Sequence, residues 1–260
     1  MAGRVGLIGH TGFVGSTLEN QTQIDARYRS TDIHQIRGQH FDLLICAGAS
    51  AKKWLANADP DADKQSIRGL IAHLTHVSAT KVVLISTVDV FSPPVGIYES
   101  SEPGGDLVTP YGQHRLELER ALSSAFDSLI VRLPGLVGPG LRKNALYDLA
   151  HHNELSKIDS RGIFQFYPMV NLWADLSRAL ELGVKVVHLT AAPLKVRDIA
   201  CDAFAIDLEN ELPGDPAVYD LRSEHAGQFG GAGNYQYSAR ESLLAIRTYA
   251  QGELLTARAE

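Results

Sequence analysis

Residues 6–18 read GLIGHTGFVGSTL, and no other part of the chain says more about its architecture. A short apolar run of strand type leads into this stretch, and a helical pattern of apolar residues closes it. Between the two stand three glycines at G-x-x-G-x-x-G spacing: Gly9, Gly12 and Gly15. Glycine permits a tight strand-to-helix turn and a close approach of the backbone to a pyrophosphate, while the helix N-terminus offers free N–H groups to that anion. The stretch predicts a dinucleotide-binding turn that also uses Phe13 and Val14; the alternative is a glycine-rich turn without a ligand.

The composition is that of a globular protein with a real core, since 45% of the 260 residues are hydrophobic and 21% are charged. A formal net charge of -6 leaves no basic footprint for nucleic acid. No apolar run approaches the roughly 20 residues that span a bilayer, and the first strand starts at Arg4, too early for a signal peptide. Cys46 and Cys201 are expected to be buried, reduced thiols. We expect a cytoplasmic protein without a metal site that binds neither nucleic acid nor membranes.

Strand-like and helix-like segments alternate through the first half of the chain. The expected strands are Val5–Ile8, Leu43–Cys46, Val82–Ser86 and Leu129–Leu133. The expected helices are Gly15–Asn20, Ala62–Leu74 and Tyr111–Ser123. Continuous apolar strands separated by amphipathic helices predict an α/β fold with a doubly wound, Rossmann-type parallel sheet that is covered on both faces.

Only 25 residues separate Gly15 from Phe41, where the second of these apolar strands begins. A doubly wound half normally places a helix and one or two further strands in that interval. Residues 26–33 can supply one strand, so we expect the sheet to be one strand short.

The second half is less regular. We expect a dinucleotide-binding domain over residues 1–134 and a small C-terminal substrate lobe over residues 135–260, partly interleaved with the sheet. The expected elements here are a loop at Leu136–Asn144, a helix at Leu172–Leu182, a strand at Val184–Leu189, a helix starting at Ile199 and a final helix at Ala239–Tyr249. The glycine-rich segment His225–Tyr237 lacks the ending of a P-loop and is interpreted as a mobile surface segment or a lid.

Two segments place small or hydroxylated residues where a strand ends. The first is CAGAS, residues 46–50, in which Ala47, Gly48 and Ala49 would let a ribose or nicotinamide lie against the backbone. Tight helix–sheet packing explains the same residues. The second segment is VVLISTVDVF, residues 82–91, where Ser86 and Thr87 fall at the carboxyl end of a strand, the place where open α/β sheets bind ligands.

Tyr111 and Arg115 form a third candidate site at the start of a helix, directly after Pro110. Their i, i+4 spacing puts both side chains on one helix face. A phenol with a pKa near 10 is a poor base at neutral pH, but a neighbouring cation and an oxidised nicotinamide ring favour phenolate and lower that pKa. The alternative is a surface Tyr–Arg pair without a role.

Together these segments resemble the extended short-chain dehydrogenase/reductase family of nucleotide-sugar epimerases, dehydratases and reductases, over roughly residues 3–145. That family carries G-x-x-G-x-x-G at its N-terminus, a Ser or Thr at the end of a later strand and Y-x-x-x-K on the next helix. The run ISTVDVF is most similar to the dTDP-4-dehydrorhamnose reductase branch, and RLPGLVGPGLRKN, residues 132–144, resembles the loop that enters the sugar-nucleotide site. The resemblance implies that Thr87 polarises the substrate oxygen and that Tyr111 gives or takes the proton.

The chain departs from the family at Arg115, where the family has lysine. Arginine preserves the charge and can bond ribose hydroxyls, but its proton is never available to a relay. Arg115 therefore acts electrostatically while water or His114 delivers the proton, or it marks weakened chemistry. Val88 stands where dehydratases carry an aspartate, which disfavours sugar dehydration, although Asp89 remains as an acid/base group or a turn carboxylate.

The cofactor is NADP or NAD, and the residues after the glycine turn bear on the choice. Arg29 suits the 2′-phosphate of NADP, whereas Asp32 could bond the 2′-hydroxyl of NAD or, as the family resemblance implies, face the adenine; we favour NADP. The candidate residues for the phosphates and the sugar ring of a substrate are Lys52, Lys53, Trp54, Asp89, Arg142 and Asn144.

The leading hypothesis is an NAD(P)-dependent enzyme that reduces or epimerises a nucleotide-activated sugar, with Thr87, Tyr111 and Arg115 as catalytic residues. A non-catalytic NAD(P)-binding sensor or scaffold is a second hypothesis, which Arg115 supports. A third is a reductase of a non-sugar carbonyl compound. The family resemblance also implies a homodimer.

Overall fold

The apolar runs of the first half form a six-stranded parallel sheet with the strand order β10-β6-β4-β3-β1-β2. The structure is a computed structural model that describes residues 3–257, with side chains as far as residue 253. The strands of the sheet are β1 (Val5–Ile8), β2 (Ala26–Tyr28), β3 (His40–Cys46), β4 (Ser78–Thr87), β6 (Ser128–Leu133) and β10 (Val186–His188). The expected α/β fold with a Rossmann-type parallel sheet is confirmed.

The sheet ends at β2, which is an edge strand beside β1. In the fuller Rossmann order 3-2-1-4-5-6, a further strand lies outside this position. Here the chain leaves β2 through a single 3₁₀ turn, η1 (Ile33–Ile36), and enters β3 on the other side of β1. The expectation of one missing strand is confirmed.

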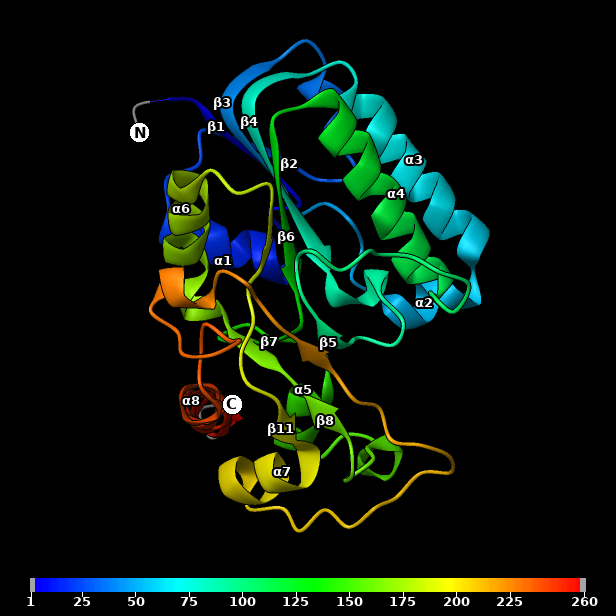
Figure 1. Cartoon of the computed structure of the whole chain (residues 1–260), viewed down its shortest axis with the longest axis vertical. Helices are drawn as coiled ribbons and strands as arrows, with labels where there is room; N and C mark the ends of the chain where they lie inside the picture. The colour runs from blue at the N-terminus through cyan, green and yellow to red at the C-terminus, as the bar shows by residue number, and fades with distance from the viewer. Residues whose placement is uncertain (1–2, 258–260) are drawn as a thin grey trace. The chain divides into compact units, whose positions relative to one another are not determined.

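Helices cover both faces of this sheet (Figure 1). On one face α3 (Pro60–Leu74) packs beside α4 (Pro110–Ala125), and on the other α1 (Phe13–Gln21) contacts α6 (Leu172–Leu182). The backbone N–H of Trp173 donates to the side chain of Gln21 at 2.9 Å, which joins the last two helices. A parallel sheet buried on two sides explains why its strands are continuously apolar rather than alternating.

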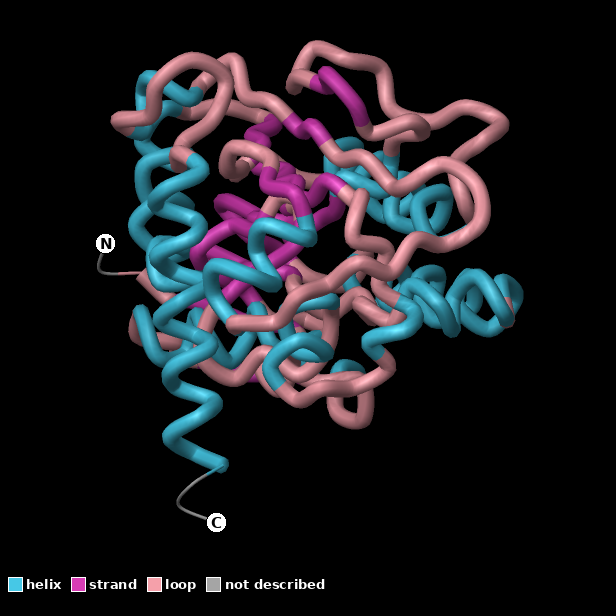
Figure 2. Tube along the Cα trace, turned by 90° about the horizontal axis from the view of Figure 1, so that it is seen from below, coloured by secondary structure: helices cyan, strands magenta, loops and turns pink. Residues whose placement is uncertain are grey.

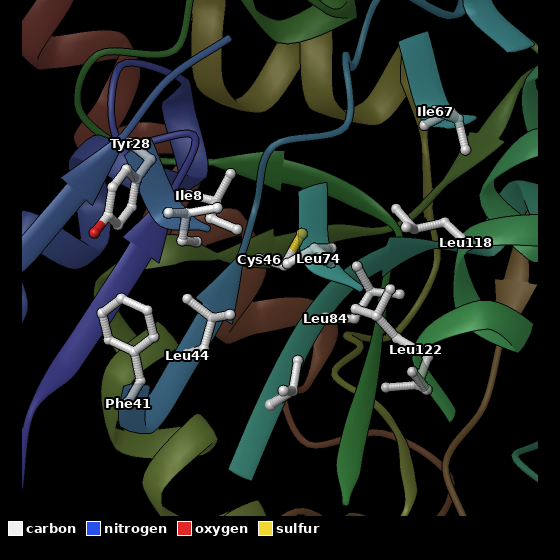
Figure 3. Close-up of a cluster of buried hydrophobic side chains, with 13 residues drawn as sticks. Ile8, Tyr28, Phe41, Leu44, Cys46, Ile67, Leu74, Leu84, Leu118 and Leu122 are labelled. Atoms are coloured by element: carbon white, nitrogen blue, oxygen red, sulfur yellow. The ribbon is translucent and has the colours of Figure 1, made fainter. Parts of the chain in front are cut away.

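The core on the α3 and α4 face joins strand and helix side chains (Figure 3). Its buried members include Ile8, Leu44, Leu84, Ile67, Leu74, Leu118 and Leu122. The Cys46 thiol lies in this cluster, and burial raises its pKa to about 11. The expectation for the other cysteine is wrong, because Cys201 is exposed on α7 (Val196–Phe204), whose buried residues are Val196, Ile199 and Ala200.

The chain divides into two compact units. The sheet belongs to residues 1–93, 100–132 and 172–187, and the second unit comprises residues 94–99, 133–171 and 188–260. Within the second unit β7 (Gly135–Val137) pairs with β9 (Phe166–Pro168), β8 (Ile163–Phe164) with β11 (Leu194–Lys195), and β5 (Val95–Ile97) with β12 (Asp220–Leu221). Its helices are α5 (Ala145–Ala150), α7 and α8 (Ala239–Ala257); in Figure 2, α8 is the cyan coil that leads to the C-terminus.

The glycine-rich segment 225–237 lies largely on the surface, as expected, and is attached to the second unit through its buried residues Ala226 and Gln236. The side-chain amide of Gln236 is buried, accepts from the Thr190 N–H at 2.9 Å and donates to the His188 carbonyl at 2.8 Å. A Cβ atom at Gly231 would overlap the carbonyl oxygen of Tyr235, so glycine is needed there for close packing. These contacts tie the segment to its own unit.

None of the helices that the structure describes has both the length and the apolar composition needed to cross a lipid bilayer. Within residues 3–257, no three His, Cys, Asp or Glu side chains gather in a way that could hold a metal ion.

Candidate active site

The three glycines of the turn at residues 9–15 have different surroundings. Gly9 has a φ of +86°, and a Cβ atom there would overlap the carbonyl of Ala47. A Cβ atom at Gly15 would overlap the carbonyl oxygen of Gly9, so α1 can approach the turn only because this residue has no side chain. Gly12, in contrast, is exposed, and its missing Cβ would have only an ordinary contact of 3.4 Å. The outer glycines serve the tight turn and the close packing, whereas the space beside Gly12 is open, as the close approach of a ligand would require.

The N-terminus of α1 fits an anionic group such as a pyrophosphate. The helix starts at Phe13, its first turn contains no acidic residue, and among the described residues no side chain caps it. Phe13 and Val14 are half-buried at this end. The unsatisfied N–H groups of such a terminus and its positive dipole end favour negative charge.

The small residues that follow β3 lie directly beside this turn. Cys46 pairs with Ile8 in register, and the Ala47 N–H donates to the Ile8 carbonyl at 2.9 Å. A Cβ atom at Gly48 would lie 2.7 Å from Cγ2 of Ile8. Tight packing therefore accounts for Gly48, and the same backbone runs along the crevice where strand order reverses, which is the ligand position in doubly wound sheets.

Arg29 and Asp32 meet at the end of β2. The Arg29 N–H donates to Oδ1 of Asp32 at 2.7 Å, and the guanidinium Nε lies 3.4 Å from Oδ2. The Arg29 side chain is 57% exposed, which leaves it open to a further anion. Asp32, which would favour NAD, is thus paired with Arg29, which would favour NADP.

Thr87 and Asp89 form a small polar turn where β4 ends. The Thr87 hydroxyl caps η2 (Val88–Val90) by accepting from the Asp89 N–H at 3.2 Å, and its oxygen lies 3.3 Å from Oδ2 of Asp89. The other carboxylate oxygen, Oδ1, is 2.7 Å from Nζ of Lys53 on α2 (Lys53–Ala58), a helix that we did not expect from the sequence. Thr87 therefore lies at the predicted sheet edge with a carboxylate and an ammonium group beside it.

Ser86, one residue earlier, has different partners. Its hydroxyl is buried and donates to Oε1 of Glu119 on α4 at 2.5 Å. Arg132 on β6 donates two hydrogen bonds to the same carboxylate, of 3.1 and 2.7 Å. The Ser86 side chain is thus part of a buried polar network in the core.

Tyr111 lies in the first turn of α4 and is 8% exposed. Its backbone N–H donates to the side chain of Asn57 on α2 at 3.0 Å. A Cβ atom at the next residue, Gly112, would overlap the carbonyl oxygen of Asp89. The start of α4 is therefore in close contact with both α2 and the turn that carries Thr87 and Asp89.

Arg115 is buried beneath Tyr111 and does not present its donors to a ligand. Its guanidinium carbon lies 3.9 Å from the centre of the Tyr111 ring. NH1 bonds the carboxylate of Asp63 on α3, and NH2 donates to the Ser50 carbonyl at 2.5 Å. The remaining Nε is buried and has no hydrogen-bond partner among the described residues. Nδ1 of His114 lies 2.7 Å from the same Asp63 oxygen, so the other residue suggested for proton delivery is bound in this network too.

The pKa of Tyr111 reflects both an effect of burial that the sequence did not indicate and the expected effect of Arg115. Burial raises its pKa above the ordinary value and outweighs the Arg115 charge, which lowers it; Asp89 adds to the rise and Lys53 opposes it. The pKa of Asp63 is lowered: burial opposes its ionisation, but hydrogen bonds from Arg115 and His114 together prevail. The chain alone therefore keeps Tyr111 as a neutral phenol and Asp63 as a carboxylate.

The candidate substrate residues are spread over both units. Lys52 is exposed at the residue that precedes α2, beside Lys53. In the second unit Arg142 is exposed, whereas the side chain of Asn144 accepts from the Leu146 N–H at 2.9 Å and donates to the Leu136 carbonyl at 2.9 Å. Asn144 thereby caps α5, and it also lines a cavity of about 460 Å³ in that unit.

Sequence reasoning missed Asn57 and Asp63 as partners of the site, and Glu119 as the partner of Ser86 in the core. Asp63 carried a readable signal, because it shares the apolar face of the expected helix with Ile67. Glu119 was signalled only through Arg132, a charged residue within the buried strand β6 that needed a buried partner.

Three solved structures superpose on nearly the whole of this chain. A dTDP-4-dehydrorhamnose reductase from Clostridium acetobutylicum superposes with a TM-score of 0.73 over 97% of this chain and 99% of that one, at 17% identity. The Bordetella bronchiseptica enzyme WbmG in complex with NAD superposes with a TM-score of 0.76 over 97% of this chain and 95% of that one, at 14% identity. RMD from Pseudomonas aeruginosa complexed with NADPH superposes with a TM-score of 0.72 over 96% of this chain and 100% of that one, at 18% identity.

No protein-family model matches the sequence, and no curated protein matches it either. Identities as low as these show the fold alone. The chain shares the fold of these solved structures over 96–97% of its length, which extends beyond residues 3–145, where the motifs resemble the extended short-chain dehydrogenase/reductase family.

Proposed function

We propose that this chain is an NAD(P)-dependent reductase or epimerase of a nucleotide-activated sugar, with Tyr111 as the acid or base at a sugar carbon. The observation that carries the proposal is the junction of β4 and α4. There the Thr87 hydroxyl, the Asp89 carboxylate and the Tyr111 phenol belong to two segments in backbone contact, at the carboxyl edge of the sheet that also carries the glycine turn.

The chemistry of these side chains suits carbonyl reduction and its reverse. In reduction, Thr87 would hold the carbonyl oxygen of a keto sugar while Tyr111 gives that oxygen a proton; in oxidation Tyr111 would take a proton from the sugar hydroxyl. A bound nicotinamide would supply or accept the hydride. The raised pKa of Tyr111 favours the protonated phenol, which is the form that reduction requires.

The residues present fit a dinucleotide. Gly12 and the N-terminus of α1 would hold the pyrophosphate, and the backbone of Ala47–Ala49 would lie along the nicotinamide half. Arg29, exposed at the end of β2, would meet a 2′-phosphate, which supports our preference for NADP over NAD. In the first unit, Lys52 is an exposed cation that suits a phosphate of the sugar nucleotide; in the second unit, the exposed Arg142 is a candidate for the same kind of group.

A second candidate is a non-catalytic NAD(P)-binding sensor or scaffold. The surroundings of Arg115 favour this candidate, because two of its guanidinium nitrogens bond Asp63 and the Ser50 carbonyl within the protein. This chain would then bind a cofactor through the glycine turn without turning over a sugar.

Ligand binding and turnover together test the two candidates. Thermal-shift measurements against NAD, NADP and a panel of UDP- and dTDP-sugars should show stabilisation by NADP and by a nucleotide sugar, since a ligand that binds only the native state raises the melting temperature. Consumption of NADPH with keto sugars of the same panel should follow. Binding of NADP without turnover of any sugar or small carbonyl compound would support the sensor instead.

Tyr111→Phe is the decisive variant. It should bind NADP like the wild type and lose about 10²- to 10⁴-fold in kcat/KM, the usual contribution of a positioned acid or base. Unchanged turnover would remove Tyr111 from the mechanism.

A further inference from the structure

Three ionised side chains besides Arg115 act on the Tyr111 phenol, and they come from three elements: Lys53 from α2, Asp89 from η2 and Asp63 from α3. Asp63 is 8% exposed and is bound to Arg115 and His114. Lys53 is different, because 41% of its side chain is exposed. Lys53 is therefore a cation that solvent can reach, paired with Asp89, whose backbone meets the residue after Tyr111.

The geometry of α2 explains how Lys53 reaches this place. Lys53 and Asn57 are one turn apart and share a face of the helix. Asn57 binds the backbone N–H of Tyr111 at 3.0 Å, and Lys53 binds the carboxylate of Asp89 at 2.7 Å. The backbone of Asp89 in turn touches Gly112, the neighbour of Tyr111. One short helix thus fixes both the start of α4 and an ammonium group beside it.

Ammonium and guanidinium groups differ in the chemistry they can perform here. Arg115 stacks on the Tyr111 ring, and its bonds run to Asp63, to the Ser50 carbonyl and to the Tyr111 carbonyl. A guanidinium also keeps its proton at any ordinary pH, whereas an ammonium can release one. Arg115 can supply charge under the ring but cannot pass a proton to the phenol.

We propose that Lys53 is the positioning residue that supplies protons to Tyr111: its ammonium, anchored by Asp89, stabilises the phenolate and returns a proton to it from solvent. The proposal rests on the proposed function. In reduction, Tyr111 gives its proton to the oxygen of the sugar as the hydride reaches the carbon, the phenolate takes a proton from Lys53, and Lys53 takes one from water. One proton passes from solvent to product in each cycle, and the hydroxide left in water is neutralised by the buffer. Arg115 thereby supplies positive charge under the ring and Lys53 supplies protons, two roles that a single lysine could combine.

The test compares Lys53→Met, Lys53→Arg and the control Lys185→Met, which removes an exposed lysine from an ion pair with Asp127, a residue that precedes β6. The ionisation of Tyr111 is followed without substrate by NMR of ring-¹³C-labelled tyrosine, with Tyr111→Phe to assign the signal. Lys53→Met should raise the pKa of Tyr111, and Lys185→Met should leave it unchanged. Lys53→Arg should keep it near the wild-type value, because the positive charge remains. The ammonium is partly exposed, so all three variants should fold, which melting curves check.

Turnover separates charge from proton supply. Lys53→Met and Lys53→Arg should both lose at least about tenfold in kcat/KM, at the low end of an acid–base contribution, while Lys185→Met keeps wild-type turnover. The proposal would be overturned if the pKa of Tyr111 were the same in Lys53→Met as in the wild type, or if Lys53→Arg kept full turnover. If the wild type turns over no substrate, the proposed function fails and the proton-supply role fails with it, whatever the NMR shows. If the wild type is active and the variants behave like it, the role of Lys53 fails alone.

Discussion

Ser86 and Thr87 are neighbours on β4, yet their hydroxyls belong to two different arrangements of the same three chemical groups. Each hydroxyl lies near a carboxylate that binds a cation: Glu119 with Arg132 on one side, Asp89 with Lys53 on the other. In the first arrangement both charged side chains are 5% exposed. In the second, the carboxylate is 17% and the ammonium 41% exposed.

The difference in burial separates structure from chemistry. A buried carboxylate with bonds to a guanidinium and a hydroxyl has its acceptors used within the protein, so it fixes the orientation of α4 against the sheet. A partly exposed pair keeps a carboxylate and an ammonium group within reach of a ligand. Alternation along a strand sends successive side chains to opposite surroundings, and here that alternation divides the core from the site.

The largest expected effect on stability comes from breaking the buried arrangement. Glu119→Ala removes the carboxylate from Arg132, and the guanidinium is left in the core without that charge. Breaking a buried pair from one side costs about 3–5 kcal/mol. The free energy of unfolding from urea titrations should fall by that amount.

The matched variant in the exposed arrangement is Asp89→Ala. Lys53 then turns to water, and we expect a loss of about 0–1 kcal/mol, as for other surface pairs. Equal losses in the two variants would show that the difference in burial does not control the energetics of the two arrangements.

Two glycines of the turn provide the next test, because they separate packing from binding. Gly15→Ala would place a Cβ atom on the carbonyl of Gly9, so α1 must shift, and overpacking of this kind costs about 1–3 kcal/mol. Gly12→Ala meets no such obstacle, and its φ of -81° suits alanine. Its unfolding free energy should change by less than about 0.5 kcal/mol.

Binding of NADP should respond differently to the same two variants. The methyl group of Gly12→Ala would stand where the pyrophosphate approaches, so affinity measured by calorimetry should fall although the fold is intact. A Gly12→Ala variant that binds NADP like the wild type would place the dinucleotide elsewhere.

The local parts of the fold were predictable from sequence. The expected strand at Val5–Ile8 has its observed bounds, and the expected helix at Ala62–Leu74 differs from α3 by two residues at its start. Apolar periodicity and glycine spacing act over a few residues, which is why they predict these elements, and the short interval between Gly15 and Phe41 predicts the missing strand. The six-residue α2 is too short to show such a pattern.

The surroundings of Tyr111 were not predictable in the same way. Arg115 and Asp63 are 52 residues apart, and nothing local indicates that they meet. The i, i+4 spacing correctly placed Arg115 next to Tyr111, but it gave no information on burial. Sequence reasoning missed the burial of Tyr111, which raises its pKa overall and outweighs the Arg115 charge, which lowers the pKa as expected.

The smallest expected effect comes from Asp127, whose carboxylate is exposed, in contrast to the buried carboxylate of Glu119. Asp127 binds Lys81 at 3.0 Å and also bonds Lys185, and hydrogen bonds from Lys185 and Lys81 lower the pKa of its carboxyl group. A lowered pKa in the folded state means that the stabilisation is present above the unfolded value of about 3.9 and is lost as the pH falls through the folded value. Asp127→Asn should therefore lower the melting temperature slightly at neutral pH and low salt. The difference from the wild type should disappear in strong acid and in roughly 1 M salt, where exposed charges are screened. Glu119→Ala should keep its deficit at that salt concentration, because water and ions do not reach the buried pair; a deficit that salt removes from both variants alike would contradict the distinction between the two arrangements.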